Sequence, residues 1–476
     1  MPLSAKYLPC GTPFDPAEDP PGSVDPLGTL GLAERIAEVL FPGFTARMWR
    51  PRLLTFTALA ALVAERAKTK IDGYQDVRLE ARLGFERLFV SAVIHQESKE
   101  SGEWEKAVKK LPGSLLARKA FLAEDSPLGS NNFLKGQAVN GPYGVMARLA
   151  RHLEIIDDDD CLTRNGEELL LAWSADQGLL GLLDEEESGS PGRQWLGRVV
   201  EEDIIHVVKG SWRSLGWSGW QDLAERLRPD VIGEGERRVL RTLLNNDSVR
   251  ARCLELMSEP SAISMFLSAR DQGRGMQDRR VLVQALLPAL APEEREEDKI
   301  IDLAIRLADA YEEVANHLET AFNALRWGLT YRGGQASPKE LEEDKELGQV
   351  FATICQGSGS ATERLSKMID EIQNVQQLAP LKESLETLTF QSLAAAESPS
   401  QLIQSVISRH LKVQNSKGKA TWIDVGDRWT LLPGFGLQEG PPGPSAGYLH
   451  PFRVPNVYSF LAELGLKELE VPDEEE

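Results

Sequence analysis

The chain has 476 residues, of which 42% are hydrophobic and 26% charged, and this composition excludes wholesale disorder. Because most domains contain about 100–200 residues, roughly two to four domains are expected. The formal net charge is −20, so a contact with nucleic acid would need a local basic patch, since the overall field repels phosphate. The alternatives are simple solubility, or acidic surfaces that meet a basic partner protein.

Cysteine spacing indicates a reducing compartment, and hydropathy indicates that no segment spans a membrane. Cys10, Cys161, Cys253 and Cys355 lie far apart, which excludes a CxxC zinc site and a dense disulfide framework. The first residues lack the charged and apolar regions of a signal peptide. The longest largely apolar run, residues 53–64, is shorter than the roughly 20 residues that span a bilayer. The sequence therefore predicts a cytoplasmic protein with no membrane partner.

The N-terminal part begins with an irregular arm. Residues 1–26 are rich in proline and glycine, and helical periodicity starts at about residue 30. Arg47, Arg50 and Arg52 then precede a helix expected over residues 53–70. Arginines gathered at the start of a helix can hold a phosphate or a partner carboxylate. The alternative is a solvated turn in which these arginines pair with nearby carboxylates.

Residues 111–172 show the order of elements found in a winged helix. A helix at 114–122 is followed by a polar turn at 131–136, and Pro142 opens a second helix, where a missing N–H costs nothing. Residues 155–163 then predict a strand, a turn and a strand before another helix starts at Arg164. The segment resembles the wing end of many bacterial winged-helix proteins.

The second helix of this segment is the candidate DNA-contacting element. Its aliphatic residues share one face, while the opposite face and the preceding turn carry the candidate DNA-binding residues Lys135, Arg148, Arg151 and His152. Four consecutive aspartates, 157–160, occupy the predicted wing tip and would repel DNA. DNA contact, protein contact and a purely structural role all remain open for this segment.

The rest of the chain predicts a mainly α, multi-domain protein. An acidic, glycine-rich run at 184–192 marks a boundary, giving a helical domain at 27–182, a second at 194–345 and a C-terminal one at 346–476. A long helix with a coiled-coil-like stripe is expected at 296–330, most simply packed within the chain. Residues 421–432 predict a small β-hairpin, and the chain ends in an acidic tail.

No catalytic site is recognisable in the sequence. The six histidines are scattered, and neither an HExxH motif nor a phosphate loop is present. His410 and Lys412 match the first half of a phospholipase-D-type signature, but Lys417 stands where its aspartate should be. Arg409, Lys412, Lys417 and Lys419 instead form a basic patch beside tryptophans, suited to phosphate or a partner, or a solvated helix end. No cofactor and no metal are predicted.

A family resemblance rests on residues 25–28, residues 40–45 and the three arginines at 47, 50 and 52. These residues resemble uncharacterised bacterial proteins encoded in antiphage defence islands, and the likeness extends weakly to about residue 172. The resemblance implies a non-catalytic subunit of an antiviral complex, with a helicase or nuclease subunit as an expected partner. Double-stranded DNA is a possible partner through the winged-helix-like segment. The alternatives are a DNA-independent adaptor or inhibitor that docks a basic partner, and a metal-dependent nuclease without a recognisable motif.

Overall fold

The computed structural model is mainly helical, as the sequence predicts. It describes residues 25–70, 77–122, 128–129, 133–184, 189–208, 217, 219–273, 275–392, 396, 398–437, 440, 443 and 445–465. The predicted N-terminal arm, apart from its last two residues, and the acidic tail lie outside this part of the chain. No helix within the described ranges is both long and apolar enough to cross a membrane.

The chain divides into two compact units, each built from two stretches of sequence. The first unit comprises Met1–Leu40 and Glu259–Phe452, and the second comprises Phe41–Ser258 and Arg453–Glu476. This division differs from the consecutive domains expected at 27–182, 194–345 and 346–476. Long-range packing explains the difference, because the first helix packs on a helix that begins at residue 296, and such pairing leaves no local signal in the sequence.

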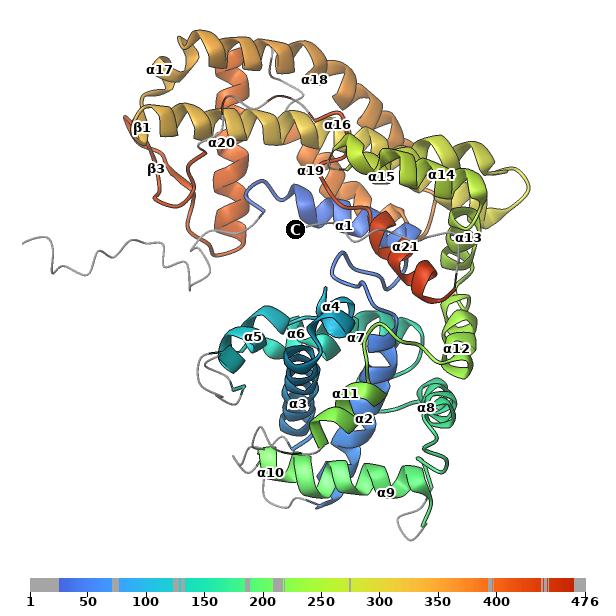
Figure 1. The fold of residues 1–476 in the computed structure, drawn as a ribbon. Coiled ribbons are helices and arrows are strands. Elements are labelled where there is room, and N and C mark those ends of the chain that lie inside the picture. The colour runs from blue at the N-terminus through green and yellow to red at the C-terminus, as the bar shows by residue number, and fades with distance from the viewer. Residues whose placement is uncertain are drawn as a thin grey trace, which may run out of the picture. The chain divides into compact units, whose positions relative to one another are not determined.

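The first unit is organised around one long helix. Helix α16 packs against α18 along most of its length and also against α1 and α20 (Figure 1). The remaining elements surround these four. The elements are α1 (Thr29–Leu40), α14 (Pro260–Ala269), η2 (Arg270–Gln272), α15 (Met276–Arg279), η3 (Arg280–Leu286), η4 (Leu287–Ala289), α16 (Glu296–Tyr331), α17 (Pro338–Glu342), α18 (Lys345–Ile372), η5 (Ala379–Leu381), α19 (Lys382–Ser392) and α20 (Pro399–Ser416).

The apolar stripe of α16 is covered within this unit. Ile300, Leu307, Val314, Leu318 and Leu325 are all buried, as expected for the intramolecular alternative. The predicted hairpin is also present, as β2 (Ile423–Asp424) and β3 (Trp429–Leu431) in antiparallel register. A third strand, β1 (Gln335–Ala336), pairs with β3 and completes the order β1-β3-β2. Its two residues carry no alternation that would predict a strand.

The second unit packs its helices around α2 and α3. Phe56 on α2 stacks on Phe85 and Phe89 of α3, with ring centroids 5.3 and 4.5 Å apart. The elements are α2 (Arg52–Lys70), α3 (Val77–Lys99), α4 (Ser101–Val108), α5 (Ser114–Leu122), α6 (Gln137–Asn140), α7 (Pro142–His152), α8 (Arg164–Asp176), α9 (Pro191–Arg198), η1 (Val199–Ile204), α10 (Ile205–Val208), α11 (Gly219–Arg226), α12 (Glu234–Leu244), α13 (Ser248–Met257) and α21 (Val454–Glu463).

The winged-helix-like segment contains the predicted helices α5, α7 and α8, but its wing is minimal. Ile156 and Leu162 form a single isolated antiparallel bridge in place of a strand pair. Between them, Asp160 accepts hydrogen bonds from Arg82 of α3 and from Arg151 of α7. The aspartate turn is thus tied to the helices behind it, and one of its four charges is balanced within the chain.

A buried carboxylate positions the start of α7. Glu86 of α3 accepts a 2.7 Å hydrogen bond from the backbone N–H of Tyr143 and another of 2.7 Å from the side-chain amide of Gln137. A β-carbon at Gly141 would lie 2.3 Å from this carboxylate, so the approach requires glycine. Burial raises the pKa of Glu86 to about 7, while the hydrogen bonds from Gln137 and Tyr143 and the nearby Arg82 oppose the shift.

The raised pKa of Glu86 makes the second unit sensitive to pH. Since the folded protein holds this proton more tightly than the unfolded chain, the contribution of the protonated carboxyl to stability is complete below about pH 4.5 and is lost as the pH rises through about 7. Glu86→Gln removes the titrating group but keeps only one acceptor oxygen for the two N–H donors. We therefore expect its stability relative to the wild type to rise by on the order of 3 kcal/mol between about pH 4.5 and well above pH 7. Thermal unfolding of both proteins across this pH range measures the difference. Parallel pH profiles for the two proteins would contradict the assignment.

Candidate functional site

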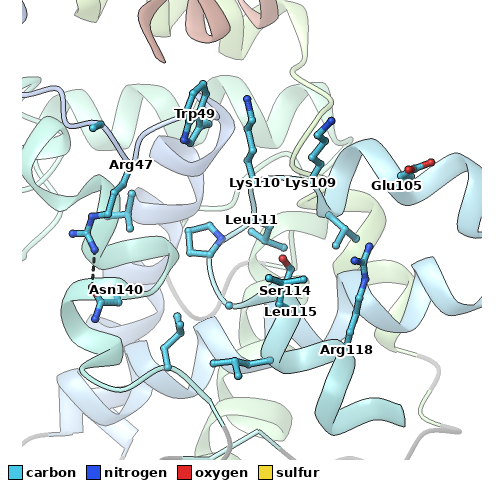
Figure 2. Close-up of a pocket in the computed structure, with 17 residues that line it drawn as sticks. Arg47, Trp49, Glu105, Lys109, Lys110, Leu111, Ser114, Leu115, Arg118 and Asn140 are labelled. Atoms are coloured by element: carbon cyan, nitrogen blue, oxygen red, sulfur yellow. Dashed lines mark hydrogen bonds between the residues drawn. The ribbon is translucent and has the colours of Figure 1, made fainter. Parts of the chain in front are cut away.

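A groove of about 750 Å³ opens on the second unit beside the winged-helix-like segment. Its walls come from the loop before α2, from the end of α4 with the loop that follows, from the start of α5, and from single residues at 134, 140 and 145. We call it the basic groove, because its rim carries Arg47, Lys109, Lys110 and Arg118 against a single carboxylate, Glu105. Figure 2 shows Arg47 on one side of the groove and Arg118 on the other.

The rim cations are oriented by contacts within the unit. Arg47 is exposed and donates a 2.6 Å hydrogen bond to the side-chain oxygen of Asn140 (Figure 2). The ammonium of Lys110 lies 3.6 Å from the centre of the Trp49 ring, within the range of a cation–π contact. The guanidinium of Arg118 pairs with Glu97 on α3, with its Nε 2.7 Å from a carboxylate oxygen. These contacts hold the cations around the groove and limit their rotamers.

The floor between these cations is apolar. Val108, Leu111 and Val145 line it and are buried against the unit, whereas Leu115 and Leu116 of α5 are 67% and 38% exposed. Two neighbouring exposed leucines inside a concave surface are unusual, since a monomer gains nothing from leaving them in water. The groove therefore combines apolar surface with positive charge, and this combination suits an amphipathic anionic ligand.

The turn between α4 and α5 gives the groove its shape. Lys110 has a positive φ of 62°, which is uncommon for a residue with a β-carbon, and Gly113 has a φ of 84°. At Gly113 a β-carbon would lie 2.4 Å from the ring of Phe133, so only glycine fits there. The turn reverses the chain within a few residues and brings Lys109 and Lys110 to the same rim as Trp49.

Helix α21 holds the loop that supplies Arg47 and Trp49. The side-chain amide of Asn456 donates hydrogen bonds of 3.0 Å to the carbonyl oxygens of Ala46 and Met48. The hydroxyl of Ser459 donates one of 2.9 Å to the carbonyl of Trp49. Buried or partly buried backbone acceptors are costly to leave unpaired, and α21 satisfies these three.

Arg50 joins three parts of the groove's support. Its guanidinium is 5% exposed, lies 2.5 Å from a carboxylate oxygen of Glu463 on α21, and also donates to the carbonyl oxygens of Lys106 and Lys109 at the end of α4. A buried cation needs such partners, because desolvation without them is costly. Arg50 therefore ties the loop before α2, helix α4 and helix α21 together.

The structure corrects the role predicted for two of the N-terminal arginines. Arg50 and Arg52 are buried anchors, not surface contacts for phosphate. Arg52 pairs with Glu236 of α12 and donates to the carbonyl of Arg226, and burial lowers the pKa of Arg52 although Glu236 opposes the shift. Only Arg47 of this trio is exposed, and it lines the basic groove. Arg50 and Arg52 instead pair with carboxylates, as the alternative interpretation of these arginines predicted.

The candidate DNA-binding residues are placed unevenly. Lys135, Arg148 and His152 are exposed, and Arg148 and His152 share the outer face of α7. Arg151 is partly covered because it donates to Asp160 in the wing turn. Most of α7 is buried, including Tyr143. This helix therefore offers a narrow outward face, and the predicted set of four is reduced to three side chains that point to solvent.

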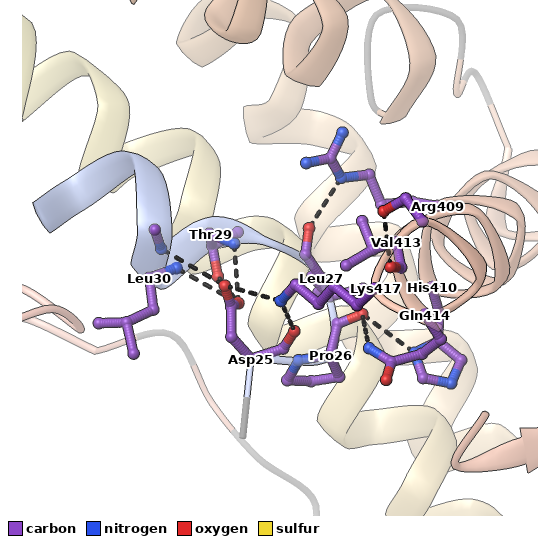
Figure 3. Close-up of polar contacts among 12 residues, drawn as sticks. Asp25, Pro26, Leu27, Thr29, Leu30, Arg409, His410, Val413, Gln414 and Lys417 are labelled. Atoms are coloured by element: carbon purple, nitrogen blue, oxygen red, sulfur yellow. Dashed lines mark hydrogen bonds and ion pairs between the residues drawn. The ribbon is translucent and has the colours of Figure 1, made fainter. Parts of the chain in front are cut away.

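Three of the four cations predicted as a basic patch near the end of α20 lie on the surface. Lys412, Lys417 and Lys419 are exposed, and only Arg409 is buried. Figure 3 shows Arg409 donating to the carbonyl of Leu27 and Lys417 bonded to Asp25. Arg409 and Lys417 thus secure the chain before α1, and the surface contact predicted for Arg409 is corrected.

His410 is a structural group. It is fully buried, with Nδ1 donating to the carbonyl of Pro26 at 3.1 Å and Nε2 accepting from the backbone N–H of Trp422 at 2.9 Å. Burial lowers its pKa to about 4, so the ring is neutral at physiological pH. Both ring nitrogens are occupied, which leaves no role for the half-matched phospholipase-D-type signature.

The described residues hold no group of three or more histidine, cysteine or acidic side chains that could bind a metal ion. Trp217 and the buried Trp220 meet edge to face at 4.8 Å. Cys161 contacts Arg78 at 3.0 Å, and no base stands beside it in the described contacts. Among the described residues, the basic groove brings several cations together beside apolar side chains, and it is therefore the candidate site.

Comparison with known proteins adds no assignment. No family model matches the chain, and neither the curated proteins nor the solved structures include a significant match.

Sequence reasoning missed most of the groove. The pair Lys109 and Lys110 is visible as a small basic cluster before Leu111, but nothing local connects it with Arg47 and Trp49, some sixty residues earlier. The signals that could have suggested a turned rim are the Pro-Gly pair after Leu111 and the two consecutive leucines at the start of α5.

The support of the groove can be tested at Arg50. We expect Arg50→Met to destabilise the second unit by about 3–5 kcal/mol, because it strands Glu463 and two backbone carbonyls. Glu463→Gln should cost much less, since the amide oxygen still accepts from Arg50 and the carbonyl bonds remain. Denaturant unfolding measures both variants, and hydrogen exchange of residues 41–50 shows whether the loop loosens. Equal losses in the two variants would refute this role of Arg50.

Proposed function

We propose that the chain is a non-catalytic subunit of a bacterial antiviral defence complex and that its basic groove holds an acidic, partly apolar segment of a partner protein. The observation that carries the binding role is the apolar floor at Leu115 and Leu116 between Arg47, Lys109 and Lys110. The defence setting is supported by the resemblance of the N-terminal residues alone. The partner's class follows from the chemistry of the groove.

The apolar floor favours a protein segment over a nucleic-acid backbone. Phosphates gain from the cations but leave leucine side chains in water, whereas a peptide can bury its own leucine or valine side chains there while its carboxylates face the rim. Burying one such side chain contributes roughly 1.5–3 kcal/mol, which corresponds to about tenfold or more in affinity. Acidic residues around apolar anchors also give electrostatic complementarity, which speeds association and selects the partner.

Model peptides can test the groove directly. We expect a short peptide of alternating glutamate and leucine to bind the full chain about tenfold more tightly than polyglutamate of the same length at one salt concentration. Fluorescence anisotropy of labelled peptides gives the ratio. The charge reversal Lys109→Glu with Lys110→Glu should abolish the binding of both peptides.

A matched control reverses two exposed lysines of the same unit that do not line the groove, Lys68→Glu with Lys99→Glu. This variant should bind both peptides nearly as well as the wild type, because the net charge changes equally but the groove is intact. If the control loses binding as much as the groove variant does, the attraction is a non-specific charge effect and the proposal fails.

A second candidate function is contact with double-stranded DNA through the outer face of α7. The specific observation in its favour is the exposure of Arg148 and His152 on that face, with Lys135 also exposed before the helix. The exposed aspartates Asp157 and Asp158 in the wing turn act against it, because they repel phosphate. In this case the cations would contact the DNA backbone, and the groove would remain free for a partner.

The DNA contact can be tested with one pair of substitutions. Arg148→Glu with Lys135→Glu should weaken duplex binding about tenfold at fixed salt and make the dependence of log affinity on log salt shallower. Arg151 is left unchanged because its pairing with Asp160 supports the wing turn. A gel-shift titration measures the affinity. Unchanged binding by this variant, or no duplex binding by the wild type, would sink the DNA hypothesis.

A further inference from the structure

The sequence that follows α21 has the composition the basic groove is suited to bind. Residues 466–476 read Leu-Lys-Glu-Leu-Glu-Val-Pro-Asp-Glu-Glu-Glu, with six carboxylates, one lysine and three branched apolar side chains. These residues lie outside the described part of the chain. Leu466, Leu469 and Val471 provide apolar anchors among the acids, so the segment is an acidic, partly apolar peptide carried by the chain itself.

We propose that residues 466–476, here called the acidic tail, occupy the basic groove of the same chain and compete with the partner segment for it. The proposal rests on the groove being a peptide site, as proposed above, and it adds a regulatory state in which the site is closed. A partner then binds only by displacing the tail.

The last described residues lie close to the groove. Helix α21 ends at Glu463, whose carboxylate is bonded to Arg50, and the same guanidinium donates to the carbonyl of Lys109 on the groove rim. One arginine side chain thus separates the end of α21 from the groove. Beyond it, Gly465 turns the chain with a φ of 99°. An extended segment spans about 3.3–3.6 Å per residue, so the residues after Gly465 have a reach of roughly 36–40 Å.

Attachment to α21 makes even weak docking effective. A segment tethered by a short connection experiences an effective concentration in the millimolar range, so an intrinsic dissociation constant of about 0.1 mM fills about nine tenths of the sites and weakens a competing peptide about tenfold. Opposite charges on the tail and on the rim favour the contact at low salt, and the apolar side chains favour it at any salt. A free partner peptide at micromolar concentration must therefore bind far more tightly than the tail does.

The test compares two forms of the full chain in their binding of one labelled peptide, residues 466–476 themselves. One form is the wild type. In the other form the tail is made neutral by the substitutions Glu468→Gln, Glu470→Gln, Asp473→Asn, Glu474→Gln, Glu475→Gln and Glu476→Gln. We expect the neutral-tail form to bind the labelled peptide about tenfold more tightly, because its own tail has lost the charges attracted to the rim cations and competes less well.

Two further proteins make the result specific. Adding Lys109→Glu and Lys110→Glu to the neutral-tail form should abolish binding, whereas adding Lys68→Glu and Lys99→Glu should leave it nearly unchanged. A chain ending at Gly465 provides an independent open form and should match the neutral-tail form. Circular dichroism checks that each protein is folded before titration.

The proposal is overturned if the labelled tail peptide fails to bind the open forms, if it binds them and the wild type equally, or if binding survives the groove reversal. These failures differ from failure of the proposed function. The test of the proposed function compares the affinities of two peptides, glutamate–leucine and polyglutamate, for one protein. A competing tail weakens both affinities equally and leaves their ratio unchanged. Loss of the preference for the glutamate–leucine peptide with retained tail binding would refute the partner site alone.

Discussion

The groove depends on the buried guanidinium of Arg50. A cation 5% exposed must be matched by acceptors, and here they come from a helix at the end of the chain and from two carbonyls at the end of α4. Arg50 bonds to the carbonyl of Lys109. Since Trp49 directly precedes Arg50 and Lys110 directly follows Lys109, this contact also brings the Trp49 ring and the Lys110 ammonium together. The binding surface is thus a consequence of an internal electrostatic requirement.

The same requirement explains why cations close together in sequence have different roles. Arg52 faces Glu236 inside the unit, while Arg47 is exposed on the groove rim. Near the other end of the chain, the buried Arg409 donates a hydrogen bond to the carbonyl of Leu27, whereas Lys412, three residues later, is exposed. A cation at a helix start or on a helix face has no fixed function. Its role depends on whether the fold places an acceptor from a remote part of the chain beside it.

Local pattern therefore predicted the elements but not the site. The stripe of α16, the hairpin β2-β3 and the helices α5, α7 and α8 follow from periodicity and turn residues within short windows. The groove needs Arg50 to meet Glu463, more than four hundred positions away, and no spacing rule encodes that contact. The two units differ from the expected domains for the same reason, since α1 packs on α16 and α21 bonds to the loop before α2, both remote in sequence.

A basic groove on a chain of charge −20 has a selectivity problem, because acidic segments of the same chain are always nearby. Charge alone cannot distinguish a partner from the chain's own carboxylates, since both neutralise the rim cations. The apolar floor can make the distinction, because each buried aliphatic side chain adds affinity that a purely acidic segment lacks. Leu115 and Leu116, exposed at apparent cost to the free protein, are then the residues that select the occupant, and Lys109 and Lys110 only attract it.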